Sequence, residues 1–211
     1  MTDYILETPL KKAPQAFIVS KFELGVAQNI ADNLIALLGP YCEKLNIAGS
    51  IRRQKPLVKD IELVCVPKKV FIQTELFGNG IDLVVPEFKK TIEAASEKIV
   101  KGNIDGRYMQ VILKNGIVLD LFLPKLSDYY RQFAIRTGSG DYSRYIIASA
   151  WRKKGWCGTD SGLRRITDCY KNGTTWKCYN ENAELPPVWH SEEEFFDWLG
   201  VKCVNPSERN V

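Results

Sequence analysis

The stretch AGSIRRQKPLVKDIELVCVP, residues 48–67, places two acidic residues inside an apolar run. Asp60 and Glu62 are one residue apart, so in a β-strand both side chains would lie on the same face. Two unpaired carboxylates in a buried strand are costly unless cations compensate them. That compensation comes either from bound metal ions or from salt bridges with nearby basic residues: Arg52, Arg53 and Lys59.

A third acid occurs in a similar setting, at Asp120 in the apolar run VLDLF. Residues 108–113 and 117–123 are β-rich runs joined by Asn115-Gly116, a strong hairpin signal. If the second run lies beside residues 60–66, three carboxylates converge. Such a group suits a pair of divalent cations about 3.5–4 Å apart, which would stabilise the attacking and leaving oxygens of a phosphoryl transfer.

The turn ahead of the acid pair has the residue types of a phosphate site. Gly49 allows the backbone to approach a ligand closely, and Ser50 adds a hydroxyl group. Arg53 can bind phosphate oxygens in a bidentate manner. A lone Gly-Ser pair is a weak signal, but its order with two arginines, the acid pair and a distant strand acid is specific.

Periodicity and turn signals predict mixed helices and strands in the first 125 residues. A capping box at Ser20 and Glu23 predicts a helix that ends at Gly39-Pro40. The other elements expected in this part are strands at 45–49, 60–66 and 81–85, a polar, Gly-containing segment before the third strand, and a helix over Phe88–Val100.

The remaining residues predict helices with a small sheet. Helices are expected over Ser127–Arg136 and Tyr142–Lys154, separated by the turn TGSGD, and short strands are expected between 156 and 189. A second capping box, Ser191 with Glu194, precedes a helix over Glu192–Leu199. This order predicts an α+β chain of two packed parts, residues 1–125 and 126–211.

Composition restricts the classes of protein to consider. No apolar run of about 18 residues is present, and the N-terminus lacks a secretory signal, so we expect no membrane contact. Six cysteines without a C-x-x-C pair and one histidine argue against zinc and favour reduced thiols in the cytoplasm. The net charge of +4 permits a polyanionic partner. Basic and aromatic residues alternate in the last third, which suits either a nucleic-acid surface or a solvated helix face.

The chain resembles the nucleotidyltransferases of the DNA polymerase β superfamily, and within it the family X DNA polymerases. The resemblance rests on Gly49-Ser50, the Ser-Ile-Arg-Arg run, the acid pair ten residues further on, and the distant strand acid. It implies a palm in residues 1–125 and a two-metal mechanism with Mg²⁺ or Mn²⁺. The catalytic and metal-binding residues that it implies are Asp60, Glu62 and Asp120.

The resemblance continues to about residue 210 and implies a C-terminal nucleotide- and DNA-binding part. The nucleotide-binding residues expected from the match are Gly49, Ser50, Arg53, Lys59, Thr137, Gly138, Ser139 and Arg144. The expected nucleic-acid contacts are Arg107, Lys153, Lys154, Arg164 and Arg165. Only about twenty residues precede the first expected palm helix, so we expect neither the lyase domain nor the helix-hairpin-helix domain of the family. The chain is similar to small viral members.

Several positions depart from the family pattern. Glu62 stands where family X has aspartate, and Lys59 replaces a glycine. Val118 replaces an arginine that supports the third acid, and Ile135-Arg136 replaces the aromatic pair that screens the sugar 2′ position. The turn TGSGD holds one residue more than its counterpart, which affects the roles expected of Ser143 and Arg144.

The leading hypothesis is a monomeric, cytoplasmic DNA polymerase that adds nucleotides from dNTP to a primer/template or gapped DNA, with a role in gap-filling repair. If the protein is viral, the compartment is the host cytoplasm. Two alternatives stay open. One keeps the chemistry but transfers to RNA, a protein or a small molecule such as an aminoglycoside, and the acid pair with Glu62 favours it. The other is a non-catalytic nucleotide- or nucleic-acid-binding protein.

Overall fold

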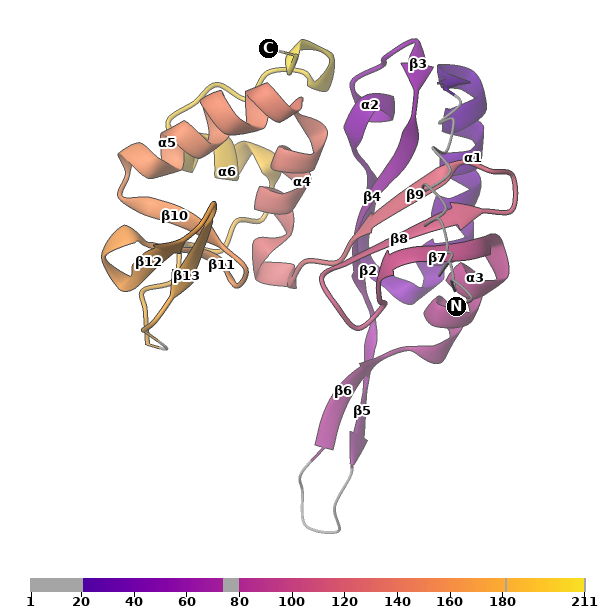
Figure 1. The fold of residues 1–211 in the computed structure, drawn as a ribbon, viewed down its shortest axis with the longest axis horizontal. Helices are drawn as coiled ribbons and strands as arrows, with labels where there is room; N and C mark the ends of the chain where they lie inside the picture. The colour runs from indigo at the N-terminus through magenta and orange to yellow at the C-terminus, as the bar shows by residue number, and fades with distance from the viewer. Residues whose placement is uncertain (1–20, 74–79, 181, 211) are drawn as a thin grey trace, which may run out of the picture.

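The computed structural model describes residues 21–73, 80–180 and 182–210. Two parts, each with its own sheet and core, lie side by side (Figure 1). The N-terminal part contains a mixed five-stranded sheet in the order β2-β4-β9-β8-β7. Its strands are β2 (Cys42–Ile47), β4 (Asp60–Pro67), β9 (Val118–Phe122), β8 (Tyr108–Leu113) and β7 (Ser96–Gly102). The α+β prediction is therefore confirmed.

Helices α1 (Leu24–Leu38) and α3 (Pro86–Ala95) cover one face of this sheet. Alternate residues of the central strands point into that core, including Ile61 and Leu63 from β4 and Leu119 from β9, all with 0% exposure. Because side chains alternate along a strand, the residues between them face the other side. The even-numbered residues of β4 and β9, including all three predicted acids, therefore lie on the opposite face.

That opposite face is only partly covered. Helix α4 (Tyr129–Thr137) packs Tyr129 and Phe133 over its far end, against Val64 and Phe122. The short helix α2 (Gly49–Arg52) lies beside the start of β4. The acids are thus on a face that the fold leaves partly open, which explains how an apolar strand tolerates them.

The C-terminal part follows the 3-10 turn η2 (Leu126–Asp128). After α4 it contains a π-helical turn η3 (Tyr142–Ile147), helix α5 (Ala148–Lys153) and helix α6 (Glu192–Leu199). A four-stranded sheet has the order β11-β10-β13-β12: Gly162–Arg165, Trp156–Thr159, Thr175–Cys178 and Cys169–Asn172. Aromatic residues dominate its core, with the Trp189 and Phe195 rings 4.9 Å apart.

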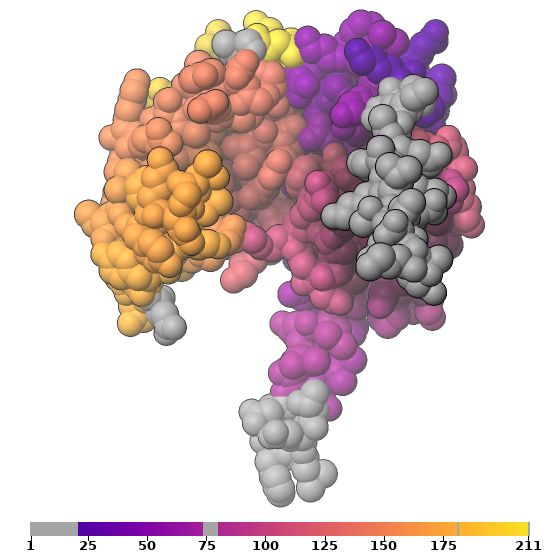
Figure 2. Space-filling model, in the orientation of Figure 1, coloured from indigo at the N-terminus to yellow at the C-terminus, as the bar shows by residue number. Residues whose placement is uncertain are grey.

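Smaller elements complete the described chain. A two-stranded ribbon, β5 (Lys69–Gln73) with β6 (Gly80–Val84), projects from the N-terminal part (Figures 1 and 2). A second pair joins β1 (Phe22–Glu23) to β3 (Leu57–Val58). Three 3-10 turns are η1 (Gly39–Tyr41), η4 (Ile166–Asp168) and η5 (Pro206–Glu208). No helix in the described ranges is long and apolar enough to cross a membrane.

The helix predicted over Phe88–Val100 is present, but its last part, from residue 96 on, was wrong. The helix α3 ends at Ala95, and β7 follows as the edge strand paired with β8. The helix ends at Ser96, where the backbone becomes extended and the hydroxyl donates to the Ile92 carbonyl oxygen at 2.6 Å. Ile99 and Val100 beyond it are β-branched, which favours a strand over a helix.

Other predicted helices and strands differ less from the observed ones. Gly49, expected in a strand, opens helix α2. The helix expected over Tyr142–Lys154 divides into η3 and α5, and β5 falls in the polar segment for which no strand was expected. The capping box at Ser191 is confirmed, since its side chain accepts a hydrogen bond from the Glu194 N–H. The box that begins at Ser20 lies outside the described residues, and the division at residue 125 stays a prediction.

Candidate active site

The three predicted acids share one face of adjacent strands. β4 and β9 are parallel, and Glu62 stands directly opposite Asp120. Asp60 precedes Glu62 by two residues on the same strand, so its side chain has the same orientation. Parallel pairing therefore unites acids from two distant segments of the sequence.

A glycine turn makes room for the Glu62 carboxylate. Gly49 has φ of +61°, and a Cβ atom at this position would lie 1.8 Å from Glu62 Oε2. The turn is fixed to β4 because the Ala48 N–H donates to the Glu62 carbonyl oxygen at 2.8 Å. Next to Gly49, the Ser50 hydroxyl is buried with no hydrogen-bond partner among the described residues. Buried hydroxyl groups usually have partners, so Ser50 is available to a ligand.

Asp120 is oriented by two donors from β8. The Tyr108 hydroxyl donates to Asp120 Oδ1 at 2.5 Å, and the Gln110 amide donates to the same atom at 2.7 Å. Burial and this hydrogen bond raise the pKa of Tyr108, so its hydroxyl stays a neutral donor. Because both donors use Oδ1, the second oxygen of Asp120 is left for another ligand.

Burial and mutual repulsion disfavour the charged forms of the acid pair. Burial, followed by the charges of Asp60 and Asp120, raises the pKa of Glu62 to about 7. Burial and the Asp120 charge likewise raise the pKa of Asp60. Like charges held together in this way are typical of functional sites rather than of structural ion pairs.

The donor set fits a hard divalent cation in its chemistry. Carboxylate oxygens are the ligands that Mg²⁺ and Mn²⁺ prefer, and a cation would relieve the repulsion among these three. Across the described ranges, however, no three His, Cys, Asp or Glu side chains are already arranged around a metal position. Glu62 leans towards Gly49 and Asp120 is held by Tyr108 and Gln110, so metal binding requires side-chain rotation.

The arginine pair beside the turn compensates these acids only in part: burial and repulsion raise the pKa of Asp60 and of Glu62 by more than the Arg53 charge lowers it. Arg52 forms a bidentate ion pair with Glu192 of α6, at 2.9 and 2.8 Å. Arg209 binds the other side of the same carboxylate, at 2.7 and 3.1 Å. Burial alone would raise the pKa of Glu192, but these hydrogen bonds outweigh it and hold the pKa below its usual range. We call Arg52, Glu192 and Arg209 the arginine–glutamate cluster.

Arg53 also contacts the C-terminal part. Its Nη1 donates to the Thr137 carbonyl oxygen at 2.7 Å, and its Nε donates to Asn210 Oδ1 at 3.2 Å. The Thr137 hydroxyl accepts from Arg52 Nη1 at 2.7 Å. The pair Arg52-Arg53 therefore joins the two parts, and the expected role of Arg53 in phosphate binding stays a prediction.

Residues 133–210 match the family model described as DNA polymerase beta thumb. The structure is similar to the ternary primer/template complex of Leishmania infantum polymerase beta, with 18% identity and a TM-score of 0.63, covering 91% of this chain and 77% of that one. The ternary gap complex of the same polymerase gives 17% identity and 0.63, over 90% and 71%. No curated protein matches the sequence.

The chain has a polymerase β-like fold. Its C-terminal part matches the thumb model, and we use the names thumb for this part and palm for the five-stranded sheet with its helices. The resemblance to polymerase β noted in the sequence is thus confirmed at the level of the fold.

The thumb turn at residues 137–139 lies at the junction with the palm. The Ser139 N–H donates to the Arg209 carbonyl oxygen at 2.9 Å, and its hydroxyl accepts from the Tyr142 N–H at 3.1 Å. At Gly138 a Cβ atom would lie 2.7 Å from the Tyr142 ring. The turn is therefore close-packed as well as polar. Lys59 and Arg144 are both exposed, Lys59 just before β4 and Arg144 within η3.

The predicted nucleic-acid contacts fall into two groups. Arg107 of the palm and Arg164 of the thumb line one pocket between the two parts. Lys153, Lys154 and Arg165 lie together at the end of α5, where Arg165 donates to the Lys154 carbonyl oxygen at 3.1 Å. Arg165 is also paired with Glu184 at 2.7 Å.

Four residues of the site were missed by the sequence reading: Tyr108, Gln110, Glu192 and Arg209. The first two could have been found, because in the predicted hairpin they fall opposite Phe122 and Asp120. Glu192 gave no local signal because its partner Arg52 lies 140 positions away, and Arg209 binds that same carboxylate. Arg136 was noted only as a departure from the family pattern; its guanidinium group stacks on the Phe122 ring at 4.0 Å, and its charge lowers the pKa of Glu62.

Proposed function

We propose that the protein is a metal-dependent nucleotidyltransferase that adds nucleotides to a DNA 3′ end, as a small polymerase of the family X type. The observation that carries this proposal is the placement of Asp60, Glu62 and Asp120 on one open face of β4 and β9, beside the Gly49 turn, in a polymerase β-like fold. A thumb that matches the family model accompanies it. The fold and the thumb match support the type of reaction, and the acceptor is argued separately.

Each residue group has a separate task in this proposal. Asp60, Glu62 and Asp120 would hold two Mg²⁺ or Mn²⁺ ions, which supply positive charge to the reacting phosphates when bound. The free oxygen of Asp120 would accept the proton of the attacking hydroxyl group. The Ser50 hydroxyl and the N–H groups of the glycine turn would donate to the phosphates. The Thr137–Ser139 turn would contact the incoming nucleotide.

DNA is the favoured acceptor for two reasons. The similar polymerase is seen in complexes with primer/template and with gapped DNA, and the thumb carries exposed basic residues at the end of α5. The alternative acceptors are RNA, a protein or a small molecule. Filling of short gaps in DNA is the cellular role that the proposal implies.

Parallel incubations would test both the reaction and the acceptor. The protein is mixed with Mg²⁺ or Mn²⁺ and each labelled dNTP or rNTP, together with a primer/template, a gapped duplex, a single-stranded DNA or an RNA. We expect extension of the DNA 3′ ends that face a template or a gap. Labelling of RNA alone would overturn the choice of acceptor.

The variant that tests the three-acid site is Asp120→Asn, which keeps the size of the side chain. The Tyr108 and Gln110 donors can still bind its remaining oxygen, so folding should be preserved. We expect incorporation to fall by a factor of about 10³ or more, since one metal ligand and the proton acceptor are lost. Incorporation at the wild-type rate would refute the three-acid site.

A further inference from the structure

The thumb sheet places two cysteines opposite each other at the open end of a hairpin. Strands β12 and β13 are joined by a turn at residues 172–175 and pair antiparallel, with Cys169 directly opposite Cys178 (Figure 1). All six cysteines of the chain are free thiols in the structure, and these two are half-buried. We call Cys169 and Cys178 the thumb thiol pair.

The hydrogen bonds of the hairpin show how close the two side chains are. Opposite residues of an antiparallel pair alternate between hydrogen-bonded and non-hydrogen-bonded positions, and the Cα atoms are nearer, at about 4.5 Å, in the second kind. The Tyr179 N–H donates to the Asp168 carbonyl oxygen at 3.1 Å, so the next pair along, Cys169 with Cys178, is non-hydrogen-bonded. A disulfide needs Cα atoms about 4.4–6.8 Å apart. The thumb thiol pair can therefore form one without a change of strand register.

A third thiol lies against the pair. The Cys169 thiol is hydrogen-bonded both to Cys178 and to Cys157 of β10. Burial and these two neighbours raise the pKa of Cys169 to about 12, and burial raises the pKa of Cys157. Because the thiolate is the form that attacks an oxidant, Cys178 reacts first and Cys169 reacts second.

Sulfur groups of this kind either bind soft metal ions or form disulfides. A structural zinc site needs four ligands in a tetrahedron. Within the ranges that the structure describes, no three His, Cys, Asp or Glu side chains surround a common metal position, and the three thumb thiols are included in that statement. The Cys178 thiol instead donates to the Asn180 carbonyl oxygen at 3.2 Å. The arrangement thus suits a bond between two sulfur atoms.

A second pair of thiols, in the palm, is close together but inaccessible. The Sγ atoms of Cys42 and Cys65 are 3.2 Å apart, yet the two residues are only 9% and 0% exposed and belong to the palm core. Buried structural cysteines of this kind are inert. Both residues of the thumb thiol pair are partly exposed, so an oxidant in solvent can reach them. The palm pair therefore serves as an internal control.

We propose that the thumb thiol pair is a modification site, at which a peroxide converts Cys169 and Cys178 into a disulfide. With hydrogen peroxide, the Cys178 thiolate attacks one oxygen, forms a sulfenic acid and releases hydroxide, which takes up the proton that Cys178 lost. The Cys169 sulfur then attacks the sulfenic sulfur, and water leaves with the Cys169 proton. Two thiols are thus oxidised to one disulfide, and the peroxide is reduced to two water molecules.

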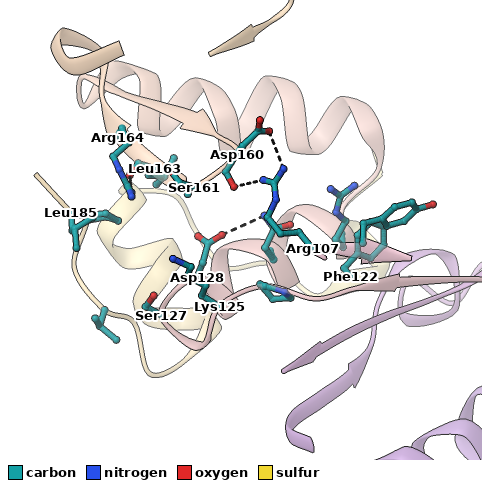
Figure 3. A pocket seen from close by; sticks show the side chains of 17 residues that line it. Arg107, Phe122, Lys125, Ser127, Asp128, Asp160, Ser161, Leu163, Arg164 and Leu185 are labelled. Carbon is teal, nitrogen blue, oxygen red and sulfur yellow. Dashed lines mark hydrogen bonds and ion pairs between the residues drawn. The ribbon is translucent and has the colours of Figure 1, made fainter. Parts of the chain in front are cut away.

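The disulfide fixes a strand that takes part in a contact with the palm. Asp160 of the thumb pairs with Arg107 of the palm at 3.3 Å (Figure 3), and it also pairs with Lys177, the neighbour of Cys178 in β13. A bond at Cys178 restricts the movement of β13 against β12. The modification does not depend on the proposed nucleotidyl transfer, because no residue of the acid face takes part in it.

Peptide mapping of the full chain tests the proposal. The protein is treated with hydrogen peroxide at low protein concentration and neutral pH, blocked with N-ethylmaleimide and cleaved with trypsin. Lysines and arginines separate all six cysteines, so that Cys169 falls in the peptide 166–171 and Cys178 in the peptide 178–202. We expect these two peptides to be joined by a bond that dithiothreitol removes. The number of blocked thiols should fall from six to four.

Three results of this experiment would overturn the proposal. The first is that peptide 166–171 stays unlinked under conditions that oxidise the palm pair. The second is a link from Cys169 to Cys157 in place of Cys178. The third is a link between two chains, which a non-reducing gel shows as a dimer.

A serine variant removes the thumb thiol pair. Cys169→Ser is chosen because Cys169 contacts both of the other thiols, and we expect its five remaining thiols to stay reduced. The control is Cys203→Ser, which replaces a half-buried thiol beyond α6 and should still lose two of its five thiols. Loss of two thiols in Cys169→Ser would refute the pair. If circular dichroism shows that Cys169→Ser does not fold, the pairing in the wild-type peptide map decides the question.

Discussion

The acid face of the palm and the arginine–glutamate cluster use buried charge in opposite ways. At the acid face three carboxylates lie together, and burial with repulsion raises the pKa of Glu62 to about 7. In the cluster one carboxylate lies between two guanidinium groups, both bidentate, and its pKa is lowered. The first arrangement is incomplete without an external cation, whereas the second is complete within the chain.

This difference separates residues that hold the molecule together from residues available for chemistry. Arg52 and Arg53 stand next to the glycine turn in the sequence, yet both join the palm to the thumb. The acids of β4 form no ion pair with any described residue, and the charges of Arg53 and Arg136 offset only part of the effect of burial and repulsion on Glu62. Where a buried charge is left uncompensated, the structure points to a ligand.

The cluster can be broken most directly at Glu192. Glu192→Gln leaves two arginines without a counter-charge, so we expect the free energy of unfolding to fall by about 3 kcal/mol. Urea denaturation followed by circular dichroism measures it. The control is Glu193→Gln, an exposed neighbour on the same helix, which should change stability by less than about 0.5 kcal/mol. Equal losses of stability in both variants would show that the buried ion pairs of Glu192 contribute no more than an exposed charge.

The acid face can be disturbed through Gly49. Gly49→Ala adds a strained positive φ and a Cβ atom that collides with Glu62, so we expect a loss of about 2 kcal/mol in stability. The matched control is Gly173→Ala, where φ is +59° and no atom lies within 4 Å of the added Cβ. It should lose about 1 kcal/mol, from backbone strain alone. Equal losses would remove the argument that Gly49 makes room for Glu62.

A glutamate-to-glutamine change has the opposite effect at the acid face, where it should stabilise the metal-free palm. Glu62→Gln removes one of three repelling charges, so we expect stability to rise by about 1 kcal/mol at pH 8 in EDTA. Glu97→Gln on the exposed strand β7 serves as the control. A loss of stability in Glu62→Gln would mean that the chain itself compensates this carboxylate.

Acid should remove the contribution of the cluster. The folded pKa of Glu192 is below the unfolded value of about 4.3, so its stabilisation is fully present above that pH and is lost as pH falls through the folded pKa. The stability difference between wild type and Glu192→Gln, measured by urea denaturation from pH 7 to pH 3, should stay constant and then shrink. A difference that grows on acidification would contradict this assignment.

The contrast between the two regions also shows which features a sequence can predict. The acid face followed from local patterns, because the two-residue spacing in β4 and the Asn115-Gly116 hairpin place the acids by strand geometry alone. The cluster joins Arg52 to a carboxylate 140 positions away, and no local pattern encodes that pairing. The helix was predicted to continue through Ile99 and Val100 because apolar residues recur at helical spacing. These two residues are β-branched, and they pair with β8 as the edge strand of the sheet.

The parallel pairing of β4 with β9 also determines when the acid face comes into being as the chain folds. The contact between the Gly49 turn and Glu62 is local, so it closes a short loop at small entropic cost. Pairing Glu62 with Asp120 closes a much longer loop that contains the ribbon, α3 and the β8 strand. Such non-local parallel contacts form slowly. We therefore expect the chain to form its glycine turn early and to bring its third negative charge to the other two only when the sheet is completed.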